Sequence, residues 1–261
     1  MAYIIAVSNE KGGVAKTTTT LSLGAALTEG GSRVLLVDMD PQANLTLSMG
    51  FEPSKVEHTI GGVLINSEPL QDVLLKSSIL GLDLIPSNMS MEHTERVLAT
   101  HNENNTFLRT AIQQVQPMPY EFILLDCPPS LGLLTLNALT AAGLLIIPTQ
   151  AEYFSAYALR DMMSIIRQIR AKSNPELAYR ILITLLDRRN RTHKDIQEQL
   201  VRAFGEGLFT TIIEIDTKLR ESPILGIPIT HYRPSSRGAQ QYRMLAEELN
   251  EYVHKAYSEA S

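Results

Sequence analysis

The chain has 261 residues, 44% of them hydrophobic, which is enough for one large α/β domain with a packed core. No apolar run reaches about 18 residues, which argues against a transmembrane helix, and the first strand candidate starts at Tyr3, which leaves no room for a signal peptide. The only cysteine, Cys127, excludes an intrachain disulfide and a cluster that needs two cysteines, and it fits a reducing cytoplasm.

Short apolar runs alternate with helical patterns along the whole chain. The expected strands are Tyr3–Val7, Arg33–Val37, Leu82–Ile85, Phe122–Leu125, Leu144–Pro148, Arg180–Leu186 and Leu208–Ile213. The expected helices are Thr17–Thr28, Met91–Thr100, Thr106–Gln114, Leu133–Ala142, Ala156–Ala171, Lys194–Phe204 and Ala239–Tyr257. This alternation predicts one α/β domain over residues 1–261, a doubly wound, mostly parallel sheet flanked by helices, with ligands at the carboxyl ends of the strands.

A glycine-rich loop follows the first expected strand and leads into the first expected helix. It reads Asn-Glu-Lys-Gly-Gly-Val-Ala-Lys-Thr-Thr from residue 9 to residue 18. Backbone N–H groups in such a loop cradle phosphates, Lys16 can reach the terminal ones, and the Thr17 hydroxyl can hold Mg²⁺. The expected nucleotide-binding residues are therefore Gly12, Gly13, Val14, Ala15, Lys16, Thr17 and Thr18.

Two of the expected strands end in carboxylates. Asp38 and Asp40 follow the second strand, and Asp126 follows the strand at Phe122–Leu125. Carboxylates at the same edge as the glycine-rich loop are well placed for a metal ion and a water molecule. Taken alone, Asp40-Pro41 is more simply a turn and Asp126 a strand-end cap, but the neighbouring loop favours the metal role for Asp126.

Basic residues are concentrated late in the chain. The net charge is −5, yet residues 180–243 hold eleven Lys and Arg against seven Asp and Glu, a local balance of +4. A predicted strand-to-helix turn carries Arg188, Arg189 and Arg191, and Lys218 and Arg220 follow downstream. Such residues can bind phosphate oxygens of DNA, although composition alone favours a solvated basic surface.

The strict Walker A pattern fails at Glu10 and Ala15, but the deviant form Lys-Gly-Gly-x-x-Lys-Thr fits from Lys11 to Thr17. In this the chain resembles the ParA/MinD branch of P-loop ATPases. Three further stretches add to the resemblance: Asp38-Met-Asp40-Pro-Gln resembles switch I, the strand ending at Asp126 looks like Walker B, and residues 218–228 and 232–239 match the C-terminal signature of Soj-type ParA proteins. The resemblance extends over essentially the whole chain.

The resemblance implies an ATPase that uses ATP and Mg²⁺. Lys16 would neutralise phosphate charge, Lys11 would reach the nucleotide of a second subunit, Asp40 would orient the attacking water, and Thr17, Asp38 and Asp126 would lie at the metal. ATP would close a homodimer that binds nonspecific double-stranded DNA. The resemblance implies DNA contacts at Arg189 and Lys218, and the local basic balance adds Arg188, Arg191 and Arg220 to the expected DNA-binding residues. Lys218 stands where arginine is common, so the charge is kept without the bidentate fork.

The resemblance also implies partners and a location. A ParB-like or other adaptor protein on the cargo would stimulate hydrolysis, and the protein would be cytoplasmic and nucleoid-associated. No N-terminal DNA-binding extension is expected before Tyr3. Two alternatives remain: a MinD-like membrane ATPase, against which the acidic stretch at residues 245–253 argues, and a metabolic P-loop enzyme.

Overall fold

A single sheet lies at the centre of the molecule. Within residues 2–153 and 155–260, which the computed structural model describes, seven strands pair in the order β3-β4-β2-β5-β1-β6-β7. All neighbouring pairs are parallel except β3 with β4, which confirms the predicted doubly wound, mostly parallel sheet. The strands are β1 (Tyr3–Val7), β2 (Val34–Asp38), β3 (Leu75–Lys76), β4 (Leu82–Ile85), β5 (Phe122–Asp126), β6 (Leu144–Gln150) and β7 (Ala178–Thr184).

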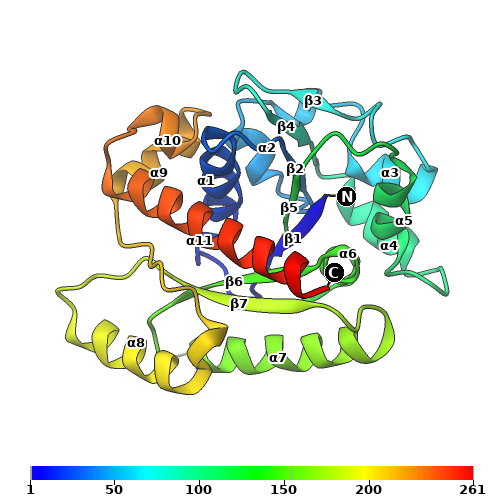
Figure 1. Ribbon diagram of the computed structural model, residues 1–261. Coiled ribbons are helices and arrows are strands. Elements are labelled where there is room, and N and C mark those ends of the chain that lie inside the picture. The colour runs from blue at the N-terminus through cyan, green and yellow to red at the C-terminus, as the bar shows by residue number, and fades with distance from the viewer. Residues whose placement is uncertain (1, 154, 261) are drawn as a thin grey trace.

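Helices cover both faces of this sheet (Figure 1). One face packs against α1, α2 and the C-terminal helices α9 to α11, and the other packs against α3 to α8. The helices are α1 (Lys16–Glu29), α2 (Asn44–Ser48), α3 (Ile60–Asn66), α4 (Met91–Leu98), α5 (Phe107–Gln114), α6 (Leu133–Ala141), α7 (Ser155–Lys172), α8 (Arg191–Phe204), α9 (Thr217–Ile224), α10 (Ile229–Tyr232) and α11 (Arg237–Ala260), with 3₁₀ turns at Pro53–Lys55 and Gly205–Gly207.

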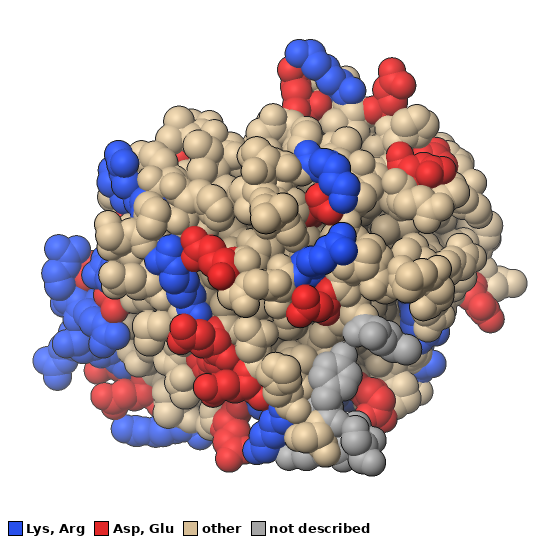
Figure 2. Space-filling model, turned by 45° about the horizontal axis from the view of Figure 1, so that its top comes forward, with Lys and Arg blue, Asp and Glu red and all other residues tan. Residues whose placement is uncertain are grey.

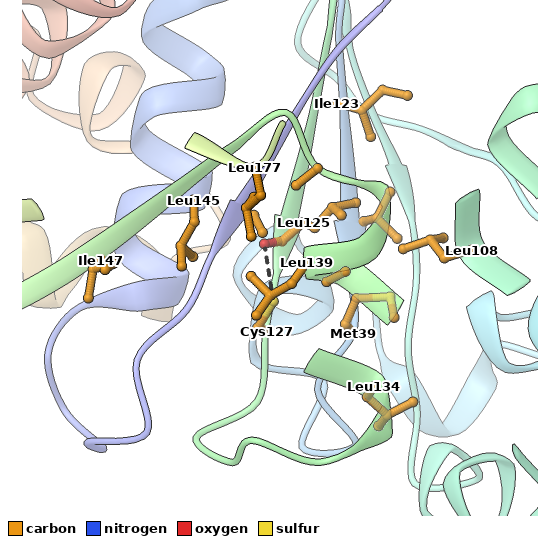
Figure 3. Packing of buried hydrophobic residues seen from close by; sticks show 14 of the residues in the cluster. Met39, Leu108, Ile123, Leu125, Cys127, Leu134, Leu139, Leu145, Ile147 and Leu177 are labelled. Atoms are coloured by element: carbon orange, nitrogen blue, oxygen red, sulfur yellow. Dashed lines mark hydrogen bonds between the residues drawn. The ribbon is translucent and has the colours of Figure 1, made fainter. Parts of the chain in front are cut away.

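The period of two along each strand divides the core into two layers. In β2, Leu35 and Val37 face the first layer, whereas Val34 and Leu36 face the second, and all four side chains are buried. Burial of a large aliphatic side chain contributes about 1.5–3 kcal/mol, so a central strand apolar on both faces is held firmly. Figure 3 shows the first layer around Cys127, which packs as a small core residue.

The strand predicted at Leu208–Ile213 is wrong. This segment runs beside β7 and forms isolated parallel bridges at Leu208 and Glu214, without a continuous ladder. Between the bridges, the amides of Thr210 and Thr211 donate to the Glu248 carboxylate of α11, at 2.6 and 2.9 Å. A side chain on α11 therefore takes amide hydrogens between the two bridges, and the ladder of a sixth parallel strand pair is interrupted there.

The other predicted strands and helices are confirmed with small shifts at their ends. The largest shift among the strands is at β7, which was expected at Arg180–Leu186 and spans Ala178–Thr184. Leu185 has a φ of 52°, so the chain leaves the extended conformation there. The short helices α2, α3, α9 and α10 were not predicted.

Candidate functional site

The glycine-rich loop connects β1 to α1 at the carboxyl edge of the sheet. Gly13 has a φ of 76°, a conformation that glycine adopts without strain. Ala15, directly before α1, has a φ of 67° and a ψ of 36°, which for an alanine costs about 1–2 kcal/mol. The sequence departs from the Walker A pattern at Ala15, where glycine is usual. The structure shows the consequence, because Ala15 adopts a left-handed conformation although it carries a methyl group.

The neighbouring strands hold this loop in place. The side-chain nitrogen of Asn9 donates to the Pro148 carbonyl at 2.8 Å, and the side-chain oxygen of Asn9 accepts from the Lys11 backbone amide at 3.0 Å. The Thr184 hydroxyl donates to the Val14 carbonyl at 3.0 Å. These contacts satisfy the Lys11 amide and the Val14 carbonyl of the loop and tie the loop to β6 and β7.

A cavity of about 460 Å³ opens beside the loop. This volume lies within the range of small-molecule sites. Its wall consists of the loop and the start of α1, the segment after β2, and residues from α2, α9 and α11: Gly12, Gly13, Ala15, Lys16, Thr17, Thr18, Asp40, Asn44, Ser48, Pro129, Leu185, Ile213, Leu219, Arg220, Pro223 and Tyr242. The structure thus brings most of the predicted nucleotide-binding residues together on one wall.

Lys16 lies at the base of this cavity and is buried. Its ammonium group donates to the Lys11 carbonyl at 3.2 Å, so it rests against the backbone of the loop. Burial lowers the pKa of Lys16, and the nearby Asp126 carboxyl opposes this shift. An anionic ligand at this place would offset the desolvation of the Lys16 ammonium group and stabilise its charged form.

Asp126 ends β5 directly beneath the start of α1. Its two carboxyl oxygens accept hydrogen bonds from Thr17 Oγ1 at 2.7 Å and from Thr20 Oγ1 at 3.2 Å. Burial, together with the Asp38 carboxyl, raises the pKa of Asp126 to about 8 against the hydrogen bonds from the two threonines.

These oxygen donors fit Mg²⁺, which prefers hard oxygen ligands. Among residues 2–153 and 155–260, no group of three or more His, Cys, Asp or Glu side chains could hold a metal ion by itself. Thr17 and Asp126 would therefore hold Mg²⁺ only together with oxygens from a ligand, which is the usual arrangement for a nucleotide-bound metal.

Asp38 and Asp40 have different surroundings. Asp38 lies opposite Asp126 in the register of β2 and β5 and is fully buried. Its oxygens accept from the Asp40 amide at 3.1 Å and from the amide and hydroxyl of Thr46 at 2.9 and 2.7 Å. Burial raises the pKa of Asp38 to about 7 against these hydrogen bonds. Asp40, in contrast, lines the cavity, and Asp38 fixes the segment that presents it.

Lys11 does not line this cavity. Its ammonium group pairs with Glu152, just after β6, at 2.6 Å, and the Lys11 side chain is 26% exposed. Together with Glu10 it borders a second hollow on the surface, lined also by Pro129–Leu131 and by α7 residues Tyr157 and Ala158. Of the two loop lysines, only Lys16 faces the cavity of its own chain.

The predicted DNA-binding residues fall into two places. Arg188, Arg189 and Arg191 lie together between β7 and the start of α8, where Arg188 pairs with Glu214 at 2.6 Å and Arg189 pairs with Asp187 at 2.9 Å. On α9, Lys218 pairs with Glu221 at 2.7 Å. Arg220, also on α9, lines the cavity.

Basic and acidic side chains are interspersed over the face shown in Figure 2. The densest group of basic side chains lies at its left edge, on the side where Figure 1 shows the connection from β7 to α8. A protein with a net charge of −5 therefore carries a local basic surface.

Several residues at the site were not predicted. Thr20 lies one helical turn after Thr17 on the same face of α1, and the Thr-Thr-Thr-Thr run could have indicated it. Thr46, which binds Asp38, and Tyr242, which lines the cavity from α11, carry no local sequence signal. Their positions depend on how distant helices pack.

Comparison with known proteins places the chain among characterised relatives. The family model described as "AAA domain" matches residues 2–179. The sporulation initiation inhibitor protein Soj of Bacillus subtilis is 38% identical, with 95% of this chain and 98% of the relative covered. The chromosome partitioning protein ParA of Caulobacter vibrioides is 35% identical, with 94% and 93% covered.

A solved structure from Mycobacterium smegmatis has the same fold. It is described as cobyrinic acid a,c-diamide synthase with bound ADP and magnesium, and it superposes with a TM-score of 0.84 at 34% identity. The match covers 98% of this chain and 97% of that one. In the part of the chain that the structure describes, no helix is both long and apolar enough to cross a membrane.

Proposed function

This chain belongs to the ParA/Soj-type P-loop ATPases, and on that premise we propose that it hydrolyses ATP to position or segregate a cargo. ATP would close a homodimer with the nucleotides at its interface, and the dimer would bind DNA without sequence preference. A ParB-like or other adaptor protein on the cargo would stimulate hydrolysis and release the dimer. Such a protein would work in the cytoplasm, on the nucleoid.

The observation that carries the dimer is the position of Lys11. It lies on the phosphate-binding loop, yet it points away from the cavity of its own chain and pairs with Glu152 at the surface. An exposed ion pair of this kind contributes about 0–1 kcal/mol, so it can be exchanged readily for a phosphate contact. In a dimer packed loop to loop, Lys11 of each subunit would contact the nucleotide bound by the other subunit.

The proposed chemistry is positioning combined with electrostatic stabilisation. A bound magnesium ion would supply positive charge beside the phosphate oxygens. Thr17 and Asp126 would hold it, and Lys16 would contact the terminal phosphates from the base of the cavity. Asp40, on the cavity wall, would orient the attacking water, and Asp38 would act beside it by fixing the segment from Asp40 to Thr46.

The proposed DNA contacts are Arg188 and Arg189 before α8, Arg191 at its first residue and Lys218 on α9. Arg189 and Lys218 pair with acidic neighbours at the surface, and these weak pairs would exchange for phosphate oxygens. Arg188 pairs with the buried Glu214, which Arg237 also contacts, so that carboxylate would keep a cationic partner if Arg188 turned to a phosphate. One monomer offers few such contacts, so a dimer that doubles them would gain affinity through effective concentration. Arg220 lies on the cavity wall.

One comparison favours a different candidate. The M. smegmatis neighbour is described as a cobyrinic acid a,c-diamide synthase, which would place an enzyme of small-molecule metabolism on the same fold. Such an enzyme would hydrolyse ATP only with its co-substrate and need not bind DNA. A MinD-like membrane ATPase is the other alternative, and liposome sedimentation would detect it.

Light scattering tests the proposed assembly. The wild-type chain should be a monomer with ADP and a dimer with ATP and Mg²⁺, whereas Lys11→Ala should remain a monomer in both. Lys255→Ala, which changes a lysine near the end of α11, serves as the matched control and should dimerise like the wild type. An unchanged mass for the wild type in ADP and ATP would contradict the proposal.

A further inference from the structure

The nucleotide cavity has an uneven distribution of charge. Of its lining residues, Lys16, Asp40 and Arg220 carry charged side chains. Lys16 lies at the base against the loop backbone, and Asp40 lies on the wall that follows β2. Arg220 is thus the second cationic side chain of the cavity, and it comes from a different element, α9.

The fold holds α9 firmly in this position. The Asp216 carboxylate caps the helix by accepting from the Lys218 amide at 2.9 Å, and its other oxygen accepts from the Gly238 amide of α11 at 3.0 Å. Leu219, next to Arg220, is buried in the core. At the far end, a methyl group on Gly226 would lie 2.9 Å from the Gly50 Cα, so the backbones beyond α9 and α2 are in close contact. Arg220 is therefore presented to the cavity by a helix that is tied to α11 and to the core.

Arg220 also differs from its basic neighbours in how its charge is satisfied. Lys218, two residues before it, donates to both oxygens of Glu221, at 2.8 and 2.7 Å. In the described part of the chain, no hydrogen bond or ion pair joins the exposed Arg220 guanidinium to another residue. Within the described residues, the guanidinium therefore faces the cavity as a cation without a partner.

We propose that Arg220 binds the phosphate chain of the nucleotide in its own subunit. Two cations would then act on the phosphates from opposite sides, Lys16 from the base of the cavity and Arg220 from α9. A planar guanidinium can give a phosphate two parallel hydrogen bonds, which an ammonium group cannot do. This inference rests on the proposed function, because it takes the cavity to hold ATP or ADP, and it replaces the expectation that Arg220 contacts DNA.

Calorimetric titration with ADP and Mg²⁺ tests the proposal. Arg220→Ala should weaken ADP binding about tenfold, as expected for a hydrogen-bonded contact to a charged group, and Arg220→Lys should recover part of the loss. Because the contact is ionic, ADP affinity should fall less steeply with salt for Arg220→Ala than for the wild type. Arg96→Ala is the matched control: Arg96 is also an exposed arginine on an eight-residue helix, α4, but it does not line the cavity.

Three results would overturn the inference. The first is an ADP affinity of Arg220→Ala equal to that of Arg96→Ala and the wild type. The second is a loss that keeps the wild-type salt dependence and is not recovered by lysine, which would indicate packing and not an ionic contact. The third is an unchanged ADP affinity with weaker DNA binding at saturating ATP, which would make Arg220 a DNA contact. If the wild type bound no ADP at all, the proposed function itself would fail.

Discussion

Replacing Ala15 by glycine should stabilise the nucleotide-free protein. Ala15 has a φ of 67°, which costs an alanine about 1–2 kcal/mol in the folded state. Glycine removes this strain but adds about 0.5–1 kcal/mol of conformational entropy to the unfolded chain. Because the Ala15 methyl group is only partly buried, little apolar contact is lost, and the net gain should be about 0.5–1 kcal/mol.

Two matched variants sharpen this test. Ala43 has a similar φ of 52° but is 1% exposed, so Ala43→Gly loses a buried methyl group worth about 0.8 kcal/mol and should be nearly neutral. Gly31 has a φ of 96° with open space around it, so Gly31→Ala should destabilise the fold by about 1 kcal/mol or more through strain alone.

Urea unfolding followed by far-UV circular dichroism measures all three, since the chain has no tryptophan for fluorescence. If Ala15→Gly were no more stable than the wild type while Gly31→Ala behaved as expected, the strain assigned to Ala15 would be wrong.

The remaining predictions concern the carboxylates of the site. Asp40→Ala should keep ATP binding and dimerisation while stopping turnover, because water positioning is lost and charge neutralisation is not. A phosphate-release assay in which this variant reached the wild-type rate would contradict the role of Asp40. Burial raises the pKa of Asp126 to about 8 from its usual 3.8, so its protonated form stabilises the nucleotide-free fold most below about pH 4, and this stability is lost as the pH rises through about 8. The unfolding free energy of the wild type should therefore fall relative to that of Asp126→Asn over this range, by up to about 1.4 kcal/mol per pH unit, and parallel pH profiles would refute the buried, protonated carboxyl.

The sequence predicted the fold well wherever a strand is buried on both faces. Near-continuous apolar runs such as Leu144–Pro148 favour a covered parallel strand, and they were placed within a few residues. The segment after residue 208 has the same apolar character but lies at the sheet edge, where Glu248 of a distant helix takes its amides. No local sequence pattern indicates that the Glu248 carboxylate will compete with β7 for these amides.

The residues of the candidate site also fall into two groups, those that the sequence predicted and those that it did not. The loop, Asp40 and Asp126 follow directly from strand ends in the sequence, because the carboxyl ends of parallel strands meet at one edge. The wall formed by α9 was missed because Pro223 lies inside this short helix, and proline usually argues against helix. Arg220 was consequently grouped with the surface arginines, although the packing of α9 turns it toward the cavity.

Binding of random-sequence DNA duplexes tests the central claim most directly. With ATP and Mg²⁺ the wild type should bind in a filter assay, and with ADP it should not. The affinity should fall by roughly 0.9 log unit per phosphate contact for each tenfold rise in salt. Arg189→Glu should weaken binding to all sequences alike. If no ATP-dependent binding were found at low salt, the partitioning function would be wrong and the metabolic alternative would take its place.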